Sequence, residues 1–217
     1  MVALVAGAIA LIRGRCRRGA AFLTLTIAFD QLARRWSRQS PTPIPMALRW
    51  ELSGARSITV LAQTLRPQPG DHLLEIGPGL GQQAVQMADL VAPDGQMHVV
   101  DVQQPMLEAT LARAHRLGAT VLGSLADQSG RLPYADACFD GAYLSSVLGE
   151  IADPARALSE LYRVLKPHGR LTVAELAGDP DFIAPKRLRR MAESAGFEFA
   201  ERRGPFVAYH ACFVRPN

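Results

Sequence analysis

A glycine-rich segment and an acid twenty residues beyond it are the residues best placed for ligand chemistry. Glu75, Gly77, Gly79 and Gly81 follow a short apolar run, and Asp101 ends the next such run. Glycine lets the backbone turn sharply and approach a ligand that a Cβ would displace. A carboxylate at the position of Asp101 can accept hydrogen bonds from both hydroxyls of a ribose. We therefore expect an adenosine compound to lie across the ends of these strands.

Two classes of adenosine ligand fit this pattern. A dinucleotide site uses G-x-G-x-x-G, in which the third glycine lets the helix pack closely on the strand. Here Gln82 stands at that position, and the glycine comes one residue earlier, at Gly81. Glu75 would repel a diphosphate, whereas it would attract the ammonium and sulfonium groups of S-adenosylmethionine. Asp101 suits both ligands, so the loop alone leaves the choice open.

Alternating strands and helices must position these residues. Apolar runs bounded by turn residues predict strands at 71–76, 98–101, 119–122, 141–144, 170–175, 197–201 and 207–214. Helical spacing of apolar residues predicts helices at 80–92, 104–117, 154–165 and 184–195. Such alternation predicts a parallel sheet covered on both faces, and the short connection between the last two strands predicts an antiparallel hairpin. The expected fold class is α/β, a Rossmann-like doubly wound sheet of seven strands, mostly parallel with an antiparallel C-terminal hairpin.

Composition excludes several classes of protein. The 217 residues are 48% apolar and 20% charged, which excludes wholesale disorder and a polytopic membrane protein. Three cysteines without zinc-ligand spacing predict neither a disulfide framework nor a metal site, and a reduced cytoplasmic compartment fits best. The net charge of +4 arises from residues 1–50, which carry eight arginines and one aspartate. Because the body has no basic excess and few aromatic residues, nucleic-acid binding is not expected.

Residues 1–45 are expected to form a helical appendage to a body at 46–217. The apolar run 1–12 is too short to span a bilayer, and the arginines that follow it stand in the wrong order for a secretory signal. A second apolar stretch at 19–29 has helical spacing, and the prolines of 37–45 predict a linker. The two helices could lie on an anionic membrane surface. Packing on the body and a cleaved transit peptide are the alternatives.

Several segments resemble the class I S-adenosylmethionine-dependent methyltransferases. The run from Leu73 to Gly81 is similar to the first motif of that family, and Val99-Val100-Asp101 is similar to the second. Four later segments resemble the branch that includes the ubiquinone and menaquinone biosynthesis methyltransferases, namely 132–134, 138–140, 147–151 and 160–167. The resemblance covers residues 70–214 and implies a seven-stranded sheet whose last strand is antiparallel.

The resemblance also implies roles for individual residues around S-adenosylmethionine. The loop Glu75–Gly81 would shape the methionine end of the cofactor site. Asp101 would hold the ribose, and Val102 would lie against the adenine. Asp127 is the nearest acid for the adenine amino group, and Ser145 would approach the methionine part of the cofactor.

Methyl transfer from a sulfonium needs little acid–base chemistry, because the methyl group is already activated and alignment supplies much of the catalysis. Glu150 is the candidate base, with an exposed or helix-capping carboxylate as the alternative, and Asp153 is expected to cap the helix at 154–165. Tyr209 and His210 are candidates for the acceptor pocket.

These observations predict an S-adenosylmethionine-dependent methyltransferase with a small, lipid-like acceptor, located in the cytoplasm or peripherally on the inner face of a membrane. Two other functions stay open. An NAD(P)-dependent reductase would use the same glycine loop and Asp101. An inactive cofactor-binding membrane adaptor would keep the fold without turnover.

Overall fold

The computed structural model describes residues 58–126, 130–177 and 179–217. The strands are β1 (His72–Ile76), β2 (Gln96–Asp101), β3 (Val121–Leu125), β4 (Phe139–Ser145), β5 (Leu165–Leu176), β6 (Glu198–Arg203) and β7 (Ala208–Val214). The helices are α4 (Ile58–Leu65), α5 (Gln82–Val91), α6 (Gln104–Leu117), α7 (Pro154–Val164) and α8 (Pro185–Ser194). The expected appendage at 1–45 and the candidate residue Asp127 lie outside the described residues.

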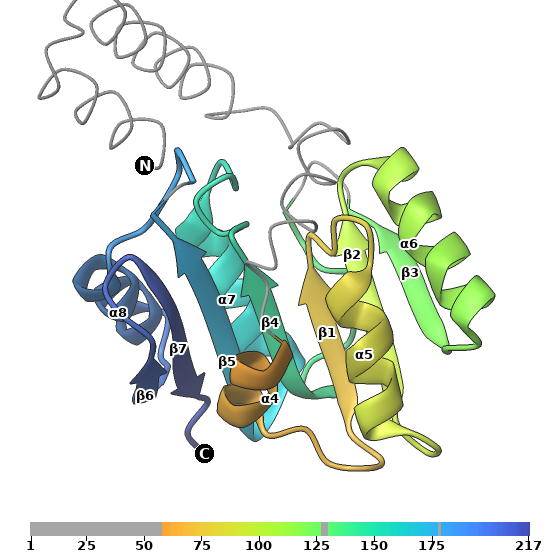
Figure 1. Cartoon of the computed structure of the whole chain (residues 1–217). Coiled ribbons are helices and arrows are strands. Elements are labelled where there is room, and N and C mark those ends of the chain that lie inside the picture. The colour runs from red at the N-terminus through yellow and green to blue at the C-terminus, as the bar shows by residue number, and fades with distance from the viewer. Residues whose placement is uncertain (1–57, 127–129, 178) are drawn as a thin grey trace, which may run out of the picture.

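Seven strands form a single sheet in the order β3-β2-β1-β4-β5-β7-β6 (Figure 1). The first five strands pair in parallel, and β7 pairs antiparallel with both β5 and β6. The expected α/β fold class and the antiparallel C-terminal hairpin are therefore confirmed. No helix within the described residues combines the length and the apolar character needed to cross a bilayer.

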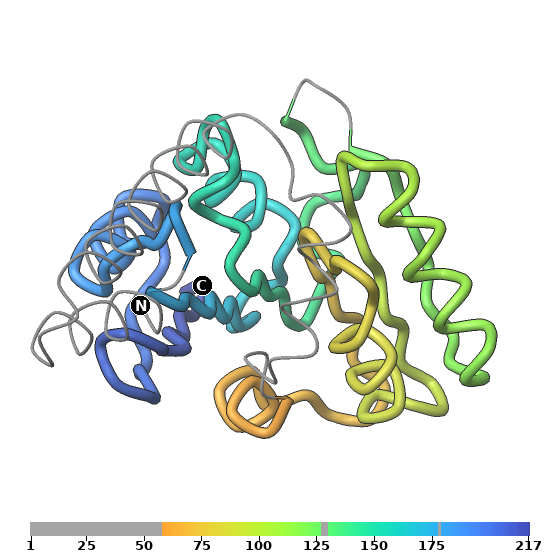
Figure 2. The backbone as a smooth tube through the Cα atoms, turned by 45° about the horizontal axis from the view of Figure 1, so that its top comes forward, coloured from red at the N-terminus to blue at the C-terminus, as the bar shows by residue number. Residues whose placement is uncertain are grey.

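Helices cover both faces of the sheet and enclose two apolar clusters. Figure 2 shows α4 and α5 on one side of the strands and α7 and α8 on the other. The central strand β4 is buried on both faces, so that Tyr143 packs in the α4 and α5 cluster while Leu144 packs in the α7 and α8 cluster. Strands covered on both sides read as nearly continuous apolar runs. This explains why the sequence pattern located them.

Helix α4 was not expected, although its apolar residues follow helical spacing. Leu61 and Leu65 are buried in the same cluster as Leu73 and Tyr143. The helix comes so close to the sheet that a Cβ on Gly141 would lie 3.2 Å from Cδ1 of Leu65. α4 therefore closes the face of the sheet that α5 leaves uncovered.

The beginning of α7 agrees with its predicted cap. The Asp153 carboxylate accepts a hydrogen bond from the Arg156 backbone N–H at 3.0 Å, and Pro154 occupies the first helical position. Such a cap satisfies backbone donors that have no partner inside the helix. Strand β5 begins earlier than predicted, because Leu165 already pairs with Phe139 before the register shift that leads to the pair of Gly141 and Arg170.

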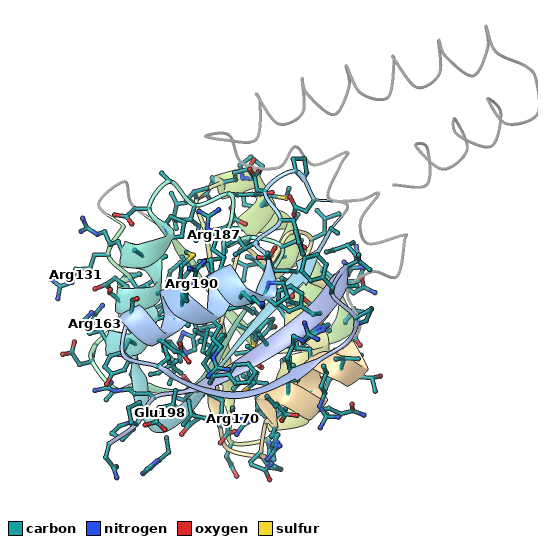
Figure 3. All side chains as sticks on the ribbon, turned by 90° about the vertical axis from the view of Figure 1, so that its left-hand side faces the viewer. Arg131, Arg163, Arg170, Arg187, Arg190 and Glu198 are labelled. Atoms are coloured by element: carbon teal, nitrogen blue, oxygen red, sulfur yellow. The ribbon has the colours of Figure 1, made fainter. Side chains whose placement is uncertain are left out.

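The hairpin of β6 and β7 forms one edge of the sheet. Glu198 pairs with Val214, which in turn pairs with Arg170, so these residues mark the end of the sheet at which β5 enters it. Figure 3 looks onto this edge and shows Arg187 and Arg190 on α8 in front of it. The turn between β6 and β7 therefore lies at the opposite end, beside the carboxyl ends of β1, β4 and β5.

Candidate functional site

A cleft of about 860 Å³ opens at the carboxyl ends of the central strands. From β1 the chain builds the sheet outward to one side through β2 and β3, and then crosses to the other side with β4 and β5. The strand order therefore reverses between β1 and β4. Ligands of doubly wound sheets bind at such a reversal. The predicted residues that line the cleft are Gly77, Gly79, Asp101, Val102, Ser145, Glu150, Tyr209 and His210.

Gly77 and Gly81 both have a positive φ, of 68° and 77°, which other residues adopt only at a cost. A Cβ on Gly77 would lie 2.6 Å from Cγ2 of Val147, so glycine is also required by the space between β1 and the segment after β4. A Cβ on Gly81 would lie 2.8 Å from Cγ2 of Thr110. Gly77 thus shapes the cleft itself, whereas Gly81 lets α6 pack against the loop.

Side chains from α6 hold the glycine loop in place. The Thr110 hydroxyl donates to the carbonyl oxygen of Gly79 at 3.0 Å, and the Arg113 guanidinium donates to that of Leu80 at 2.8 Å. With these carbonyl groups bound on the α6 side, the loop is fixed before any ligand arrives. The sequence offered no signal for this role, because the contacts join residues more than thirty positions apart.

Glu75 lies fully buried beneath the glycine loop. The Tyr143 hydroxyl on the neighbouring strand β4 donates to its Oε2 atom at 2.9 Å. Buried carboxyl groups need such partners, because their transfer from water is costly. The carboxyl predicted for the methionine end is therefore bound to β4, and it is not among the residues that line the cleft.

The Asp101 carboxylate is oriented by its own turn. Its side chain is at the carboxyl end of β2 and the residue is 8% exposed. The backbone N–H of Gln103 donates to Oδ1 at 2.8 Å, which fixes the direction of the carboxylate. Val102 is 60% exposed and presents an apolar surface in the same cleft. Both residues predicted to contact the ribose and the adenine therefore line the cleft, and Ala126 lines it just before Asp127, which lies outside the described residues.

The end of β4 separates the two halves of the cleft. Ser145, the residue predicted to approach the methionine part of the cofactor, is buried and lines the cleft. The next residue, Ser146, has a positive φ of 55°, and its N–H donates to the carbonyl oxygen of Ala174 at 2.8 Å. The chain therefore turns sharply after β4 and carries Glu150 into the cleft. The α7 cap belongs to Asp153, so Glu150 does not serve that purpose.

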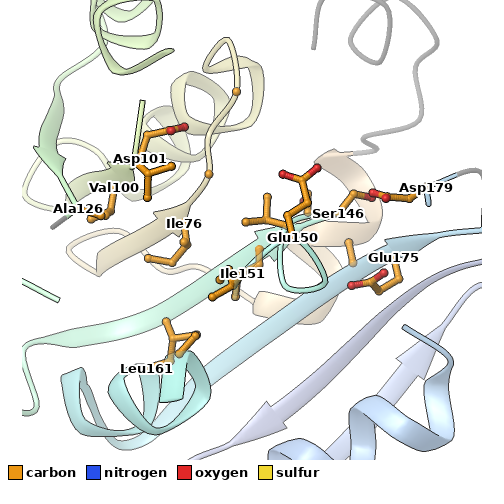
Figure 4. A pocket seen from close by; sticks show the side chains of 18 of the residues that line it. Ile76, Val100, Asp101, Ala126, Ser146, Glu150, Ile151, Leu161, Glu175 and Asp179 are labelled. Carbon is orange, nitrogen blue, oxygen red and sulfur yellow. The ribbon is translucent and has the colours of Figure 1, made fainter. Parts of the chain in front are cut away.

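Three acids line the half of the cleft away from Asp101. Figure 4 shows Glu150, Glu175 and Asp179 together on that side. Glu175 is only 4% exposed, and its Oε2 accepts the backbone N–H of Ile183 at 3.1 Å. Burial, and then the charges of Asp179, Asp181 and Glu150, raise the pKa of Glu175 to about 8. Neither these acids nor any other group of three His, Cys, Asp or Glu side chains among the described residues is arranged so that it could hold a metal ion.

Sequence reasoning missed Glu175, although it located the strand that carries it. An acid at the end of an apolar strand is visible in the sequence. The groups around Glu175 are not, because they come from β7, from the segment between β5 and α8 and from the segment before α7.

Tyr209 and His210 both line the cleft, as expected, but from opposite faces of β7. The Tyr209 hydroxyl donates to the Ile183 carbonyl oxygen at 2.6 Å, so it positions the backbone beside Glu175. Burial raises the pKa of Tyr209. The Nε2 atom of His210 is buried without a hydrogen-bond partner in the described part of the chain. Burial lowers the pKa of His210 to about 4, so this ring is neutral at pH 7.

Comparisons with known proteins agree with this geometry. A family model described as a methyltransferase domain matches residues 74–173. The chain is 34% identical over 152 residues to a demethylmenaquinone methyltransferase of Symbiobacterium thermophilum, covering 68% of this chain and 57% of that protein. It is 33% identical over 144 residues to an O-methyltransferase of Pyrenophora dematioidea, covering 62% and 52%. The chain thus spans about half the length of these curated relatives.

A solved structure has the same architecture. The crystal structure of an S-adenosylmethionine-dependent methyltransferase from Aquifex aeolicus superposes with a TM-score of 0.73 at 16% identity, covering 80% of this chain and 99% of that one. At this identity the likeness shows the fold alone. The sequence matches, rather than this structure, agree with the family resemblance inferred from the motifs.

Proposed function

We propose that this chain, whose domain belongs to the class I S-adenosylmethionine-dependent methyltransferases, transfers the methyl group of that cofactor to a small acceptor. The observation that carries the proposal is the pairing of the Gly77 loop with the fixed Asp101 carboxylate at the strand-order reversal. When bound, the cofactor supplies a methyl group activated by positively charged sulfur.

The residues of the cleft fit this cofactor. Gly77 has no side chain, and the space that a Cβ would need is already taken by Val147. A ligand can therefore approach the backbone of the loop closely. The Asp101 carboxylate can accept hydrogen bonds from ribose hydroxyls, and the exposed Val102 offers contact to an adenine. Glu75 beneath the loop favours a cationic ligand over a diphosphate. This argues against the reductase alternative.

The protein would act mainly by alignment and by excluding water. Apolar side chains line the cleft, among them Leu144 and the residues Ile76, Ile151 and Leu161 that Figure 4 labels. A dry, shaped site holds the acceptor atom in line with the methyl group, and such positioning supplies a large part of the rate enhancement. Glu150 is our candidate base for acceptors whose reacting atom carries a proton.

We propose a largely apolar acceptor that carries an oxygen near the methylated atom. The apolar lining and the three acids in the half of the cleft away from Asp101 support this. One relative is named for demethylmenaquinone and another as an O-methyltransferase, and both names are consistent with such an acceptor.

We further propose that the protein works in the cytoplasm at the surface of a membrane. Residues 1–45 have the apolar and arginine-rich character of interfacial helices. At the mouth of the cleft, Phe206 is 57% exposed beside Gly204 and Pro205, which line the cleft. Deletion of residues 1–38 should abolish sedimentation with anionic vesicles at low salt, whereas persistent binding would refute this attachment.

Transfer of labelled methyl groups tests the function. The full chain is incubated with methyl-labelled cofactor and a cell extract, and the labelled product is identified. Asp101→Asn should strongly reduce incorporation, whereas Asp94→Asn, at an exposed position, should not. Cofactor binding without any incorporation would favour the inactive adaptor instead.

A further inference from the structure

We propose that Glu175 forms the acceptor subsite by donating a hydrogen bond from Oε1 to an uncharged oxygen, such as a ketone or quinone carbonyl, of an apolar acceptor. This inference rests on the proposed methyl transfer and names the chemical class of its acceptor. It also predicts that a cationic amine is a poor ligand for the same position.

The geometry leaves one oxygen of Glu175, in the wall of the cleft, without a hydrogen-bond partner among the described residues. The residue is 4% exposed, lines the cleft, and pairs across the sheet with Tyr209. Its Oε2 atom accepts the N–H of Ile183 at 3.1 Å. Its Oε1 atom is buried and has no hydrogen-bond partner in the described part of the chain. A buried polar atom without a partner is costly, so a ligand that supplies one would be bound preferentially.

The charges around Glu175 determine which kind of ligand fits. Asp179 and Asp181 face it from the segment between β5 and α8, Glu150 from the segment before α7, and Tyr209 from β7. Burial and these acids raise the pKa of Glu175 to about 8, so the carboxyl is largely protonated at pH 7. A neutral carboxyl offers one O–H donor, which an ionised one does not.

The hydrogen bond from Ile183 decides where the proton lies. Because the N–H of Ile183 requires Oε2 as an acceptor, the proton is placed on Oε1. Oε1 is also the oxygen without a partner. Figure 4 places Glu175 across the cleft from Asp101 and Val100. A donor on Glu175 would therefore bind the end of the ligand that lies farthest from Asp101.

A matched pair of probes tests the proposal on the full chain. 1-Acetylnaphthalene carries a carbonyl, and 1-(1-naphthyl)ethylammonium carries a cation on the same skeleton. Their dissociation constants are measured by titration calorimetry for the wild type, Glu175→Gln, Glu175→Leu and the control Glu198→Gln. Glu198 is exposed and lies at the opposite end of the sheet, near Arg170 (Figure 3).

The ketone should bind the wild type, E175Q and E198Q with similar affinity, because an amide also donates a hydrogen bond. It should bind E175L roughly 5- to 10-fold more weakly, the equivalent of one neutral hydrogen bond. Raising the pH from about 7 to about 9 should weaken ketone binding to the wild type but not to E175Q, because only Glu175 ionises. Tighter binding of the ammonium probe, or loss of ketone binding in E175Q, would overturn the proposal.

Two readouts separate this inference from folding and from the proposed function. S-adenosylhomocysteine is titrated into every variant to check that its cofactor site is intact. If E175L no longer binds it, that variant is set aside, and the proposal is judged from the pH dependence of ketone binding in E175Q and in the wild type. Absence of S-adenosylhomocysteine binding in the wild type would contradict methyl transfer without affecting the ketone result. In addition, the infrared carboxyl band lost in E175Q should titrate near pH 8, and titration near the ordinary value of about 4.3 would refute the neutral donor.

Discussion

Substitution of Gly77 by alanine should destabilise the chain through two separable effects. The first is conformational, because Gly77 has a φ of 68°, where an added Cβ meets its own backbone. This costs roughly 1–2 kcal/mol. The second is steric, because the Cβ would lie 2.6 Å from Cγ2 and 2.8 Å from Cγ1 of Val147.

The steric effect is substantial because valine is branched at Cβ and has few rotamers with which to yield. Overpacking of this kind costs about 1–3 kcal/mol. We therefore expect Gly77→Ala to lower the free energy of unfolding by roughly 2–5 kcal/mol in total.

Urea denaturation followed by circular dichroism measures this loss, and Gly70→Ala is the matched control. Gly70 has a φ of 91° but nothing within 4 Å of an added Cβ, so it reports the backbone effect alone. In a double-mutant cycle, Val147→Ala should recover the steric part in the G77A background. Equal losses in G77A and G70A would refute the reasoning.

Three further predictions concern polar side chains. Tyr143→Phe removes the 2.9 Å hydrogen bond to Glu75 and should cost about 1–3 kcal/mol of stability by denaturation, together with a weaker affinity for S-adenosylhomocysteine. Burial holds the pKa of His210 at about 4 in the folded chain, so on acidification the unfolded chain binds a proton at this residue before the folded chain does. The free energy of unfolding should therefore decrease as the pH is lowered from about 6.5 to about 4, and His210→Asn should make it depend less on pH in that range. Arg163→Lys should lower the melting temperature, because its guanidinium bonds Glu160, Asp136 and two carbonyls at once, which an ammonium cannot reproduce; an unchanged melting temperature would contradict this.

Sequence patterns located most of the fold for a physical reason. Strands covered on both faces are continuously apolar, and the helices between them repeat apolar residues every three or four positions. Gly81 and Asp101 were identifiable because turn geometry and strand ends leave local signatures. Helix α4 was missed even though Ile58, Leu61 and Leu65 have helical spacing. Its eight residues give a short pattern, and its place is set by tertiary packing against Leu73.

The half of the cleft away from Asp101, where we propose that the acceptor binds, could not be predicted in the same way. Glu175 is an ordinary acid in the sequence, and its distinctive state arises from Ile183 and Asp179, in the segment between β5 and α8, and from Glu150, in the segment before α7. The anchoring of the glycine loop by Thr110 and Arg113 likewise depends on how α6 packs. Long-range contacts of this kind leave no periodic signal.

Titration calorimetry with S-adenosylhomocysteine and with NADH tests the central claim most directly. The full chain should bind S-adenosylhomocysteine, and Asp101→Asn should bind it more weakly than the wild type, while NADH should give no heat. Tight binding of NADH with no heat from S-adenosylhomocysteine would contradict the assignment of a sulfonium nucleoside to the cleft between Gly77 and Asp101.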